Sequence, residues 1–137
     1  MSAIQPYLFF GGRCDEALAF YKNALDAHID MLIRFNEAPE PIPSEMRSPG
    51  FEKKVMHAQF TVAGSAIMAS DGCQPGEGFS GFSLSLTLPT PADVQRVFDK
   101  LADGGEVSMP VGKTFWSPCF GMVKDRFGVQ WMVTVPE

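Results

Sequence analysis

Residues 90–105 read Thr-Pro-Ala-Asp-Val-Gln-Arg-Val-Phe-Asp-Lys-Leu-Ala-Asp-Gly-Gly, and this stretch carries both start and stop signals of a helix. Thr90 is placed as an N-cap, Pro91 suits the first helical position, and Gly104 can take the left-handed conformation that ends a helix. The apolar residues recur at the spacing of one buried helical face: Val94, Val97, Phe98, Leu101 and Ala102. The stretch therefore predicts an amphipathic helix.

The same apolar stripe occurs 77 positions earlier (Ala17 to Val94), and its members are Ala17, Phe20, Tyr21, Ala24 and Leu25. Each stripe is preceded by one strand-like segment and followed by three. In the first half these four segments are 6–10, 28–35, 55–62 and 65–70. In the second half they are 82–88, 106–110, 119–124 and 129–135. Both halves read β-α-β-β-β. We predict an α+β fold in one domain, 1–137, with module 1 at about 1–72 and module 2 at about 80–137.

Turn-forming residues separate these segments. Val62 to Ser65 and Asp125 to Gly128 are predicted hairpin turns. The segments Ala38 to Gly50 and Asp71 to Gly81 are predicted loops, the second of them joining the modules.

Composition excludes several classes of function. The formal net charge is −5, with 11 Lys and Arg against 16 Asp and Glu, so no basic surface for nucleic acid is expected. No apolar run approaches the length of a membrane span, which is about 20 residues, and no signal peptide is read at the N-terminus. Three cysteines, far apart in sequence, are typical of a reducing compartment. We expect a cytoplasmic protein.

Several stretches resemble the PhnB-like branch of the vicinal oxygen chelate superfamily, which includes glyoxalase I, extradiol dioxygenases and bleomycin resistance proteins. They are Pro6 to Cys14, Met56 to Ala58, Ile67 to Asp71, Phe82 to Leu86, Lys113 to Trp116 and Phe120 to Val129. The resemblance spans nearly the whole chain. It implies two cupped, mostly antiparallel sheets with helices outside, a cavity in the concave face, and a homodimer.

The resemblance also implies a divalent metal held by His, Glu or Gln on four strands. In glyoxalase-like sequences the first ligand lies fifteen residues before the helix tyrosine, here Tyr21, and that position is Pro6. The repeat gives Ser83 for the second module, and the last strands give Met68 and Met132. Because these residues make a poor site for a hard or borderline cation, we expect no metal and no cofactor. A site built from His57, Gln59 and a distant acidic residue stays open.

The alternation of side chains along a strand assigns faces to the remaining candidates. Placing positions 6, 83 and 132 on the concave side predicts that Tyr7 and Phe9 pack under the helices instead. The predicted pocket then has His57 as a candidate catalytic group and the following ligand-binding residues: Leu8, Phe10, Gln59, Met68, Ser83, Ser85, Phe115, Trp116, Gln130 and Met132.

Simpler roles compete with these. Phe115 and Trp116 could cap the pocket or be buried against a dimer partner. His57 could serve only as a hydrogen-bonded strand residue. Lys113 and Arg34 are weak candidates for an anionic ligand, and Cys119 is read as a core residue.

Three hypotheses follow. The first, favoured slightly, is a protein that binds a small organic molecule without chemistry. The second is a lyase- or dioxygenase-like enzyme acting on a small oxygenated substrate, with a non-standard site in which His57 serves as general acid or base. The third and least favoured is a structural or interaction module. The turn Gly11-Gly12 lacks the spacing of a dinucleotide-binding loop.

Overall fold

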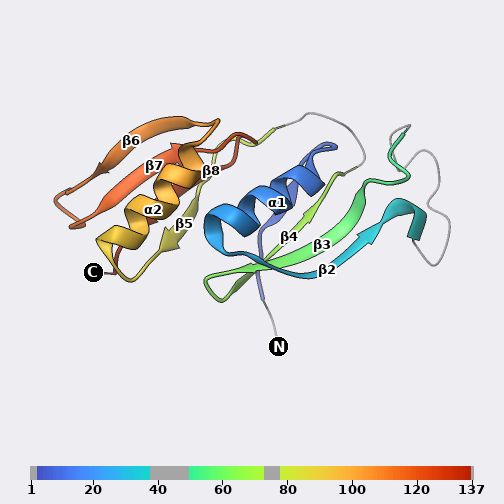
Figure 1. Cartoon of the computed structure of the whole chain (residues 1–137), viewed down its shortest axis with the longest axis horizontal. Helices are drawn as coiled ribbons and strands as arrows, with labels where there is room; N and C mark the ends of the chain where they lie inside the picture. Colours follow the sequence, from blue (N-terminus) through green and yellow to red (C-terminus); the bar gives the residue numbers. More distant parts are fainter. Residues whose placement is uncertain (1–2, 38–49, 73–77, 137) are drawn as a thin grey trace. The chain divides into compact units, whose positions relative to one another are not determined.

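A computed structural model describes residues 3–37, 50–72 and 78–136, and the chain divides into two compact units, 1–78 and 79–137. Figure 1 shows the elements of each unit along the chain. Most of the predicted loop at 38–50 lies outside the described residues, as do 73–77 of the loop between the modules. No described helix is long and apolar enough to cross a membrane.

The first unit contains one helix and one four-stranded sheet. In chain order its elements are β1 (Tyr7–Phe9), α1 (Cys14–Leu25), β2 (His28–Arg34), the short 3-10 helix η1 (Phe35–Glu37), β3 (Val55–Val62) and β4 (Ser65–Ser70). The strand order is β1-β4-β3-β2, with β1 parallel to β4 and the other pairs antiparallel.

The second unit repeats this arrangement. Its elements are β5 (Leu84–Thr87), α2 (Pro91–Ala102), β6 (Glu106–Gly112), β7 (Phe120–Lys124) and β8 (Gln130–Thr134). The strand order β5-β8-β7-β6 matches that of the first unit, with one parallel and two antiparallel pairs. The predicted α+β class and the twofold β-α-β-β-β pattern are confirmed.

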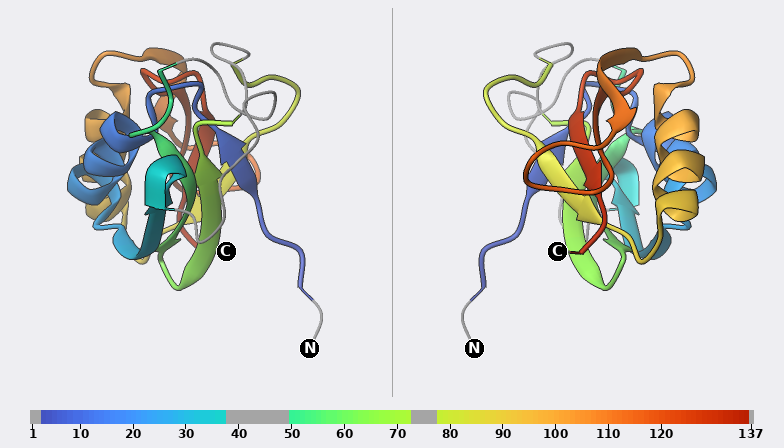
Figure 2. Two further views of the ribbon diagram at one scale, coloured as in Figure 1. Left: turned by 90° about the vertical axis from the view of Figure 1, so that its right-hand side faces the viewer. Right: turned by 90° about the vertical axis from the view of Figure 1, so that its left-hand side faces the viewer.

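In each unit the helix lies against one face of its own sheet (Figure 2). The hydrophobic core of each unit forms between the helix and this face of the sheet. Tyr21 of α1 is fully buried and stacks on Phe60 of β3, with ring centroids 5.8 Å apart. On α2, Val94, Val97, Phe98 and Leu101 are buried, as the apolar stripe predicts. Burial of such side chains supplies about 1.5–3 kcal/mol each.

The two helices begin differently. The Thr90 side chain accepts a hydrogen bond from the Asp93 amide at 3.2 Å, so α2 carries the predicted cap. Arg13, which precedes α1, makes no such bond. Instead, Asp71 accepts hydrogen bonds from the amides of Gly12 at 2.9 Å and Cys14 at 2.8 Å. A residue far along the chain therefore satisfies the start of α1.

Asp71 has a third partner, because its Oδ2 accepts the Val55 amide at 2.8 Å. The carboxylate is fully buried, and three N–H donors compensate its loss of water. Burial, reinforced by the nearby charge of Asp71, raises the pKa of the Cys14 thiol far above its usual value. Cys14 is therefore a core residue and not a nucleophile.

One predicted face assignment is wrong. On β1, Leu8 is 1% exposed, whereas Tyr7 and Phe9 are 37% and 55% exposed, so Leu8 and not its neighbours faces α1. Phe10 is also buried, 6.1 Å from Tyr21 between ring centroids. Leu8 and Phe10 thus belong to the core and not to the predicted pocket wall.

The reason is a difference of one residue between the units. Tyr7 pairs with Met68 and Ser85 pairs with Met132, so Tyr7 and Ser85 are equivalent, although counting back from the helices by 77 pairs Leu8 with Ser85. The connection through Gly11 and Gly12 is one residue longer than its counterpart before α2. A shift of one residue in a strand moves every side chain to the other face.

Candidate functional site

The face of the first sheet opposite α1 carries the candidate site, which we call the open face of unit 1. The strand register aligns Tyr7 of β1 with Met68 of β4, Met68 with Gln59 of β3, and Gln59 with Met31 of β2. These four residues form one row across the sheet. Since side chains alternate along a strand, Phe9 and His57 lie on the same face as this row. We define the open face of unit 1 by these six residues.

His57 is fixed by a hydrogen bond within this face. Its Nδ1 lies 3.0 Å from the hydroxyl oxygen of Tyr7, and the ring centroids are 5.6 Å apart. Burial raises the pKa of Tyr7 above its usual value, against the opposite effect of a side-chain hydrogen bond with Ser70. The phenol therefore stays protonated and can donate its proton to Nδ1. With Nδ1 as acceptor, neutral His57 carries its own proton on Nε2.

Tyr7 and Phe9 form an aromatic pair beside His57. Their ring centroids are 4.9 Å apart with an interplanar angle of 28°, so the rings are stacked. Gly72, with φ +72°, lies against Phe9, and a Cβ at this position would come within 3.2 Å of Phe9 Cδ1. Neither aromatic residue was among the predicted site residues. The extra residue at Gly11-Gly12 is the sequence signal that could have identified them.

The second sheet also has a face opposite its helix, and its residues are more polar. Ser85 pairs with Met132, and Met132 pairs with Met122 of β7. Gln130 alternates with the buried Trp131 and so shares this face with Met132. Ser83 is half-buried just before β5. Ser85, Gln130 and Met132 therefore lie on the face that the sequence predicts for them.

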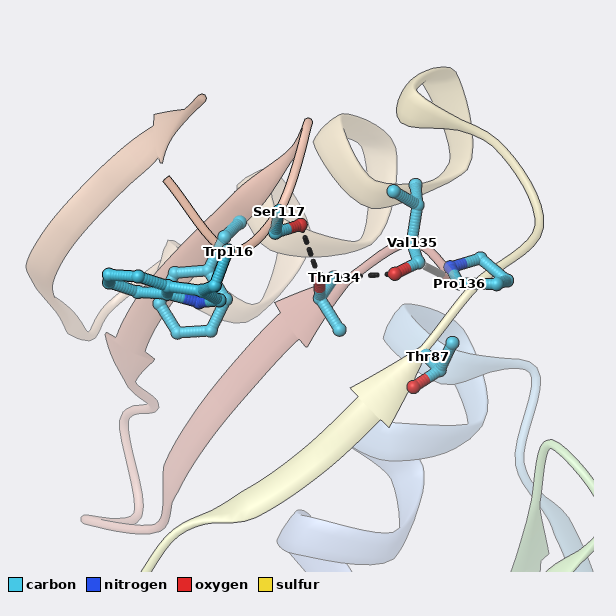
Figure 3. A pocket seen from close by; sticks show the side chains of 7 residues that line it. Thr87, Trp116, Ser117, Thr134, Val135 and Pro136 are labelled. Carbon is cyan, nitrogen blue, oxygen red and sulfur yellow. Dashed lines mark hydrogen bonds between the residues drawn. The ribbon is translucent and has the colours of Figure 1, made fainter. Parts of the chain in front are cut away.

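A hollow of about 200 Å³ lies where β5 and β8 end, and Figure 3 shows the side chains around it. Its lining is Thr87, Trp116, Ser117, Phe120, Thr134, Val135 and Pro136. The Ser117 and Thr134 hydroxyls are 2.9 Å apart, and they lie 3.0 and 3.1 Å from the Cys119 carbonyl oxygen, so one of them can donate to this oxygen while the other donates to its partner hydroxyl. These two hydroxyls are largely used within the unit.

Trp116 borders this hollow, but its neighbour does not. The Trp116 ring packs edge-on to Phe120 at 5.4 Å between centroids. Phe115 is 97% exposed and contacts Trp116 at 4.7 Å between centroids. Of Phe115 and Trp116, it is therefore Trp116 that lines this hollow.

Arg34 and Lys113 were weaker candidates for binding an anionic ligand. Arg34 donates two hydrogen bonds of 2.9 Å to the Asp15 carboxylate and one of 2.9 Å to the Lys53 carbonyl. This pairing lowers the pKa of Asp15, in spite of an opposing effect of burial. Lys113 is exposed, and Cys119 is buried as predicted.

Metal ligands are scarce in the part of the chain that the structure describes, where no group of three or more His, Cys, Asp or Glu residues could hold an ion. Counting from Tyr21 gives Pro6 as the first of the four expected positions, but the register of β1, in which Tyr7 is equivalent to Ser85, moves this position to Gln5. The other three are Ser83, Met68 and Met132. One amide oxygen, a hydroxyl and two thioethers are a poor set for a hard or borderline divalent cation.

Comparison with known proteins adds the following. A family model described as 3-demethylubiquinone-9 3-methyltransferase matches residues 2–134. Protein YjdN of Escherichia coli is 39% identical over 96% of this chain and 94% of its own length.

Solved structures agree with this match. Protein PA1353 from Pseudomonas aeruginosa is 42% identical, with a TM-score of 0.85 over 98% of both chains. A Bacillus cereus protein called a putative 3-demethylubiquinone-9 3-methyltransferase, PhnB protein, is 32% identical, with a TM-score of 0.81 over 98% of this chain and 100% of its own. A glyoxalase/bleomycin resistance protein/dioxygenase domain from Frankia, 14% identical, shares the fold at a TM-score of 0.69 over 100% and 99% of the two chains.

Proposed function

The chain belongs to the family described as 3-demethylubiquinone-9 3-methyltransferase, in the vicinal oxygen chelate superfamily, and from this premise we propose that it binds a small organic molecule without a metal. The observation that carries the proposal is the open face of unit 1. There Tyr7, Phe9 and Met68 offer apolar surface beside the polar groups of His57 and Gln59. Ligand sites are typically apolar with a few convergent polar groups.

We propose ligand contacts in each unit by itself. In the first unit they are the open-face residues Tyr7, Phe9, His57, Gln59 and Met68. In the second unit they are Ser83, Ser85, Gln130 and Met132 on the sheet face, Trp116 beside the hollow and the exposed Phe115 next to it. The poor fit of the four expected donor positions to a divalent cation supports binding without a metal.

Methyl transfer, which the description of the family names, is not the function we propose. A methyl-donating nucleotide cofactor would need free backbone amides in a glycine-rich turn after a strand. In the turn after β1, the Gly12 amide donates to Asp71 and the Gly12 carbonyl accepts from Lys54 at 2.9 Å. The Gly12 amide is thus already used within the fold, and the turn also lacks the glycine spacing of a nucleotide-binding loop, so we do not propose such a cofactor here.

A second candidate function is catalysis on a small oxygenated substrate, favoured by the Tyr7–His57 hydrogen bond of 3.0 Å. A histidine oriented by a second group is suited to general acid–base catalysis. Here Tyr7 would position His57, and Nε2 would exchange the proton with the substrate. The substitution His57→Ala should then abolish turnover of any substrate that is found, while unchanged turnover would remove this candidate.

Native mass spectrometry of freshly purified protein, paired with elemental analysis, tests the main proposal. We expect a metal-free protein that retains a small organic molecule. Stoichiometric zinc, nickel, manganese or iron would contradict it and favour metal-assisted chemistry. The same spectrum reports the oligomeric state, for which we propose a homodimer.

We also propose that the protein works in the cytoplasm. Cys14 and Cys119 are both buried as free thiols, which supports a reducing compartment. Fractionation of cells that make the protein tests this location.

A further inference from the structure

We infer that the ligand of the open face of unit 1 is a neutral, planar aromatic molecule that carries an oxygen acceptor, such as an aryl ketone. This inference rests on the proposed binding function and names its ligand class. Three features of the described residues support it: the aromatic pair, the direction of the His57 proton, and the charge of the face.

The aromatic pair provides a flat surface at the edge of the sheet. Tyr7 and Phe9 are stacked at 4.9 Å, and 55% of Phe9 and 37% of Tyr7 remain exposed. Gly72 lies close to the Phe9 side chain, since a Cβ at position 72 would come within 3.2 Å of Phe9 Cδ1. Because its neighbours limit its motion, the Phe9 ring presents a preset surface on which a planar π system gains more than a saturated ring.

The proton on His57 selects for an acceptor. The Tyr7 hydroxyl lies 3.0 Å from Nδ1, and when the phenol donates to this nitrogen, the neutral imidazole carries its proton on Nε2. The face therefore offers an N–H donor next to the stacked rings, and a carbonyl oxygen can accept from it. A ligand without an acceptor would leave this donor unpaired when it displaces water.

The charge of the face selects for a neutral molecule. With His57 as a neutral imidazole, all six members are uncharged; the other five are Tyr7, Phe9, Met31, Gln59 and Met68. The chain as a whole carries a formal net charge of −5. An anionic ligand would find no fixed cation among these six residues, and the Asp30 carboxylate, which lies by Thr61 farther along β3, is already engaged by the Thr61 hydroxyl at 2.6 Å.

Three matched probes test the inference by NMR titration of the full chain. Acetophenone has the aromatic ring and the carbonyl, cyclohexyl methyl ketone has the carbonyl on a saturated ring, and ethylbenzene has the ring alone. We expect acetophenone to bind roughly fivefold more tightly than either of the others, since stacking and the hydrogen bond each contribute about 1 kcal/mol. The amide shifts should centre on β1 and β3.

Variants separate the two contributions. Phe9→Leu should abolish the preference for acetophenone over the saturated ketone. Tyr7→Phe keeps the ring but removes the hydroxyl, so it should reduce the preference over ethylbenzene and release the His57 tautomer, which imidazole 15N shifts report. Phe82→Leu, which changes an aromatic residue 43% exposed in the other unit, is the control and should change neither preference.

Equal binding of the two ketones, with no effect of Phe9→Leu, would overturn the inference. If no probe binds while native mass spectrometry finds a retained molecule, the ligand class is wrong and the binding function stands. If no probe binds and no molecule is retained, both are wrong.

Discussion

At the scale of single residues, two aspartates show how the fold accommodates a buried carboxylate. Asp71 is 0% and Asp125 is 3% exposed. Asp125 accepts hydrogen bonds from the amides of Phe127 and Val129 and from the Trp131 indole at 2.9, 3.1 and 2.9 Å. Its partners are close in sequence, whereas those of Asp71 come from two distant places in unit 1, the start of α1 and the start of β3.

We expect Asp71→Asn to lower the free energy of unfolding by about 3 kcal/mol, because the amide cannot accept all three N–H bonds and leaves buried donors unsatisfied. Urea unfolding followed by fluorescence measures this. Glu16→Gln, an exposed carboxylate on α1, is the matched control and should change stability by less than about 0.5 kcal/mol. Equal losses for the two variants would contradict the structural role of Asp71.

The Arg34–Asp15 pair gives a prediction about pH. Its hydrogen bonds hold the folded pKa of Asp15 below the unfolded value, so the contribution to stability is present above about pH 3.9 and is lost as the pH falls through the folded pKa. The side chains are 33% and 51% exposed, so solvent screening should keep the coupling below about 1 kcal/mol.

A double-mutant cycle of Arg34→Gln and Asp15→Asn measures this coupling. The coupling energy should be present at pH 7 and smaller at pH 2.5, because protonation of Asp15 removes its charge as the pH falls. A coupling of equal size at both would show that the charge of Asp15 is not its source.

At the scale of elements, the helices and turns were predictable because their signals are local. Thr90, Pro91 and Gly104 lie beside the residues that they affect, and the bounds of α2 follow from them. The face of β1 was not predictable by counting from the helix, because Gly11 and Gly12 lengthen the connection. Likewise, the cap of α1 by Asp71 depends on a contact across 57 positions, which no local pattern reveals.

The sheet of unit 2 contains a matched pair of glycines for a packing test. A Cβ at Gly121 of β7 would lie 2.8 Å from a ring carbon of Phe98, whereas a Cβ at Gly112 of β6 would meet nothing within 4 Å. We expect Gly121→Ala to cost about 1–3 kcal/mol and Gly112→Ala less than about 0.5 kcal/mol. Thermal unfolding of both variants tests how closely α2 packs on its sheet, and similar melting temperatures would argue against this packing.

At the scale of the whole molecule, the two units repeat the same strand order, but their side chains at equivalent positions differ in chemistry. The strand orders match, but the equivalent positions Tyr7 and Ser85 carry a phenol and a small hydroxyl. The repeat in the sequence predicted the shared topology correctly. It could not predict the Tyr7–His57 bond, since that bond depends on which side of β1 faces the helix.

The proposed metal-free binding gives a prediction for the whole protein. Dialysis against EDTA should leave the amount of retained ligand and the melting temperature unchanged. Loss of ligand after dialysis, restored by a single divalent metal, would contradict the proposal.

The different caps of the two helices have a consequence for synthesis of the chain. While the ribosome is still making the first unit, α1 has no partner for its leading amides until residue 71 has emerged. By contrast, Thr90 is made before the helix that it caps. Nascent α1 should therefore stay frayed until β4 is complete, whereas nascent α2 can form as it leaves the tunnel.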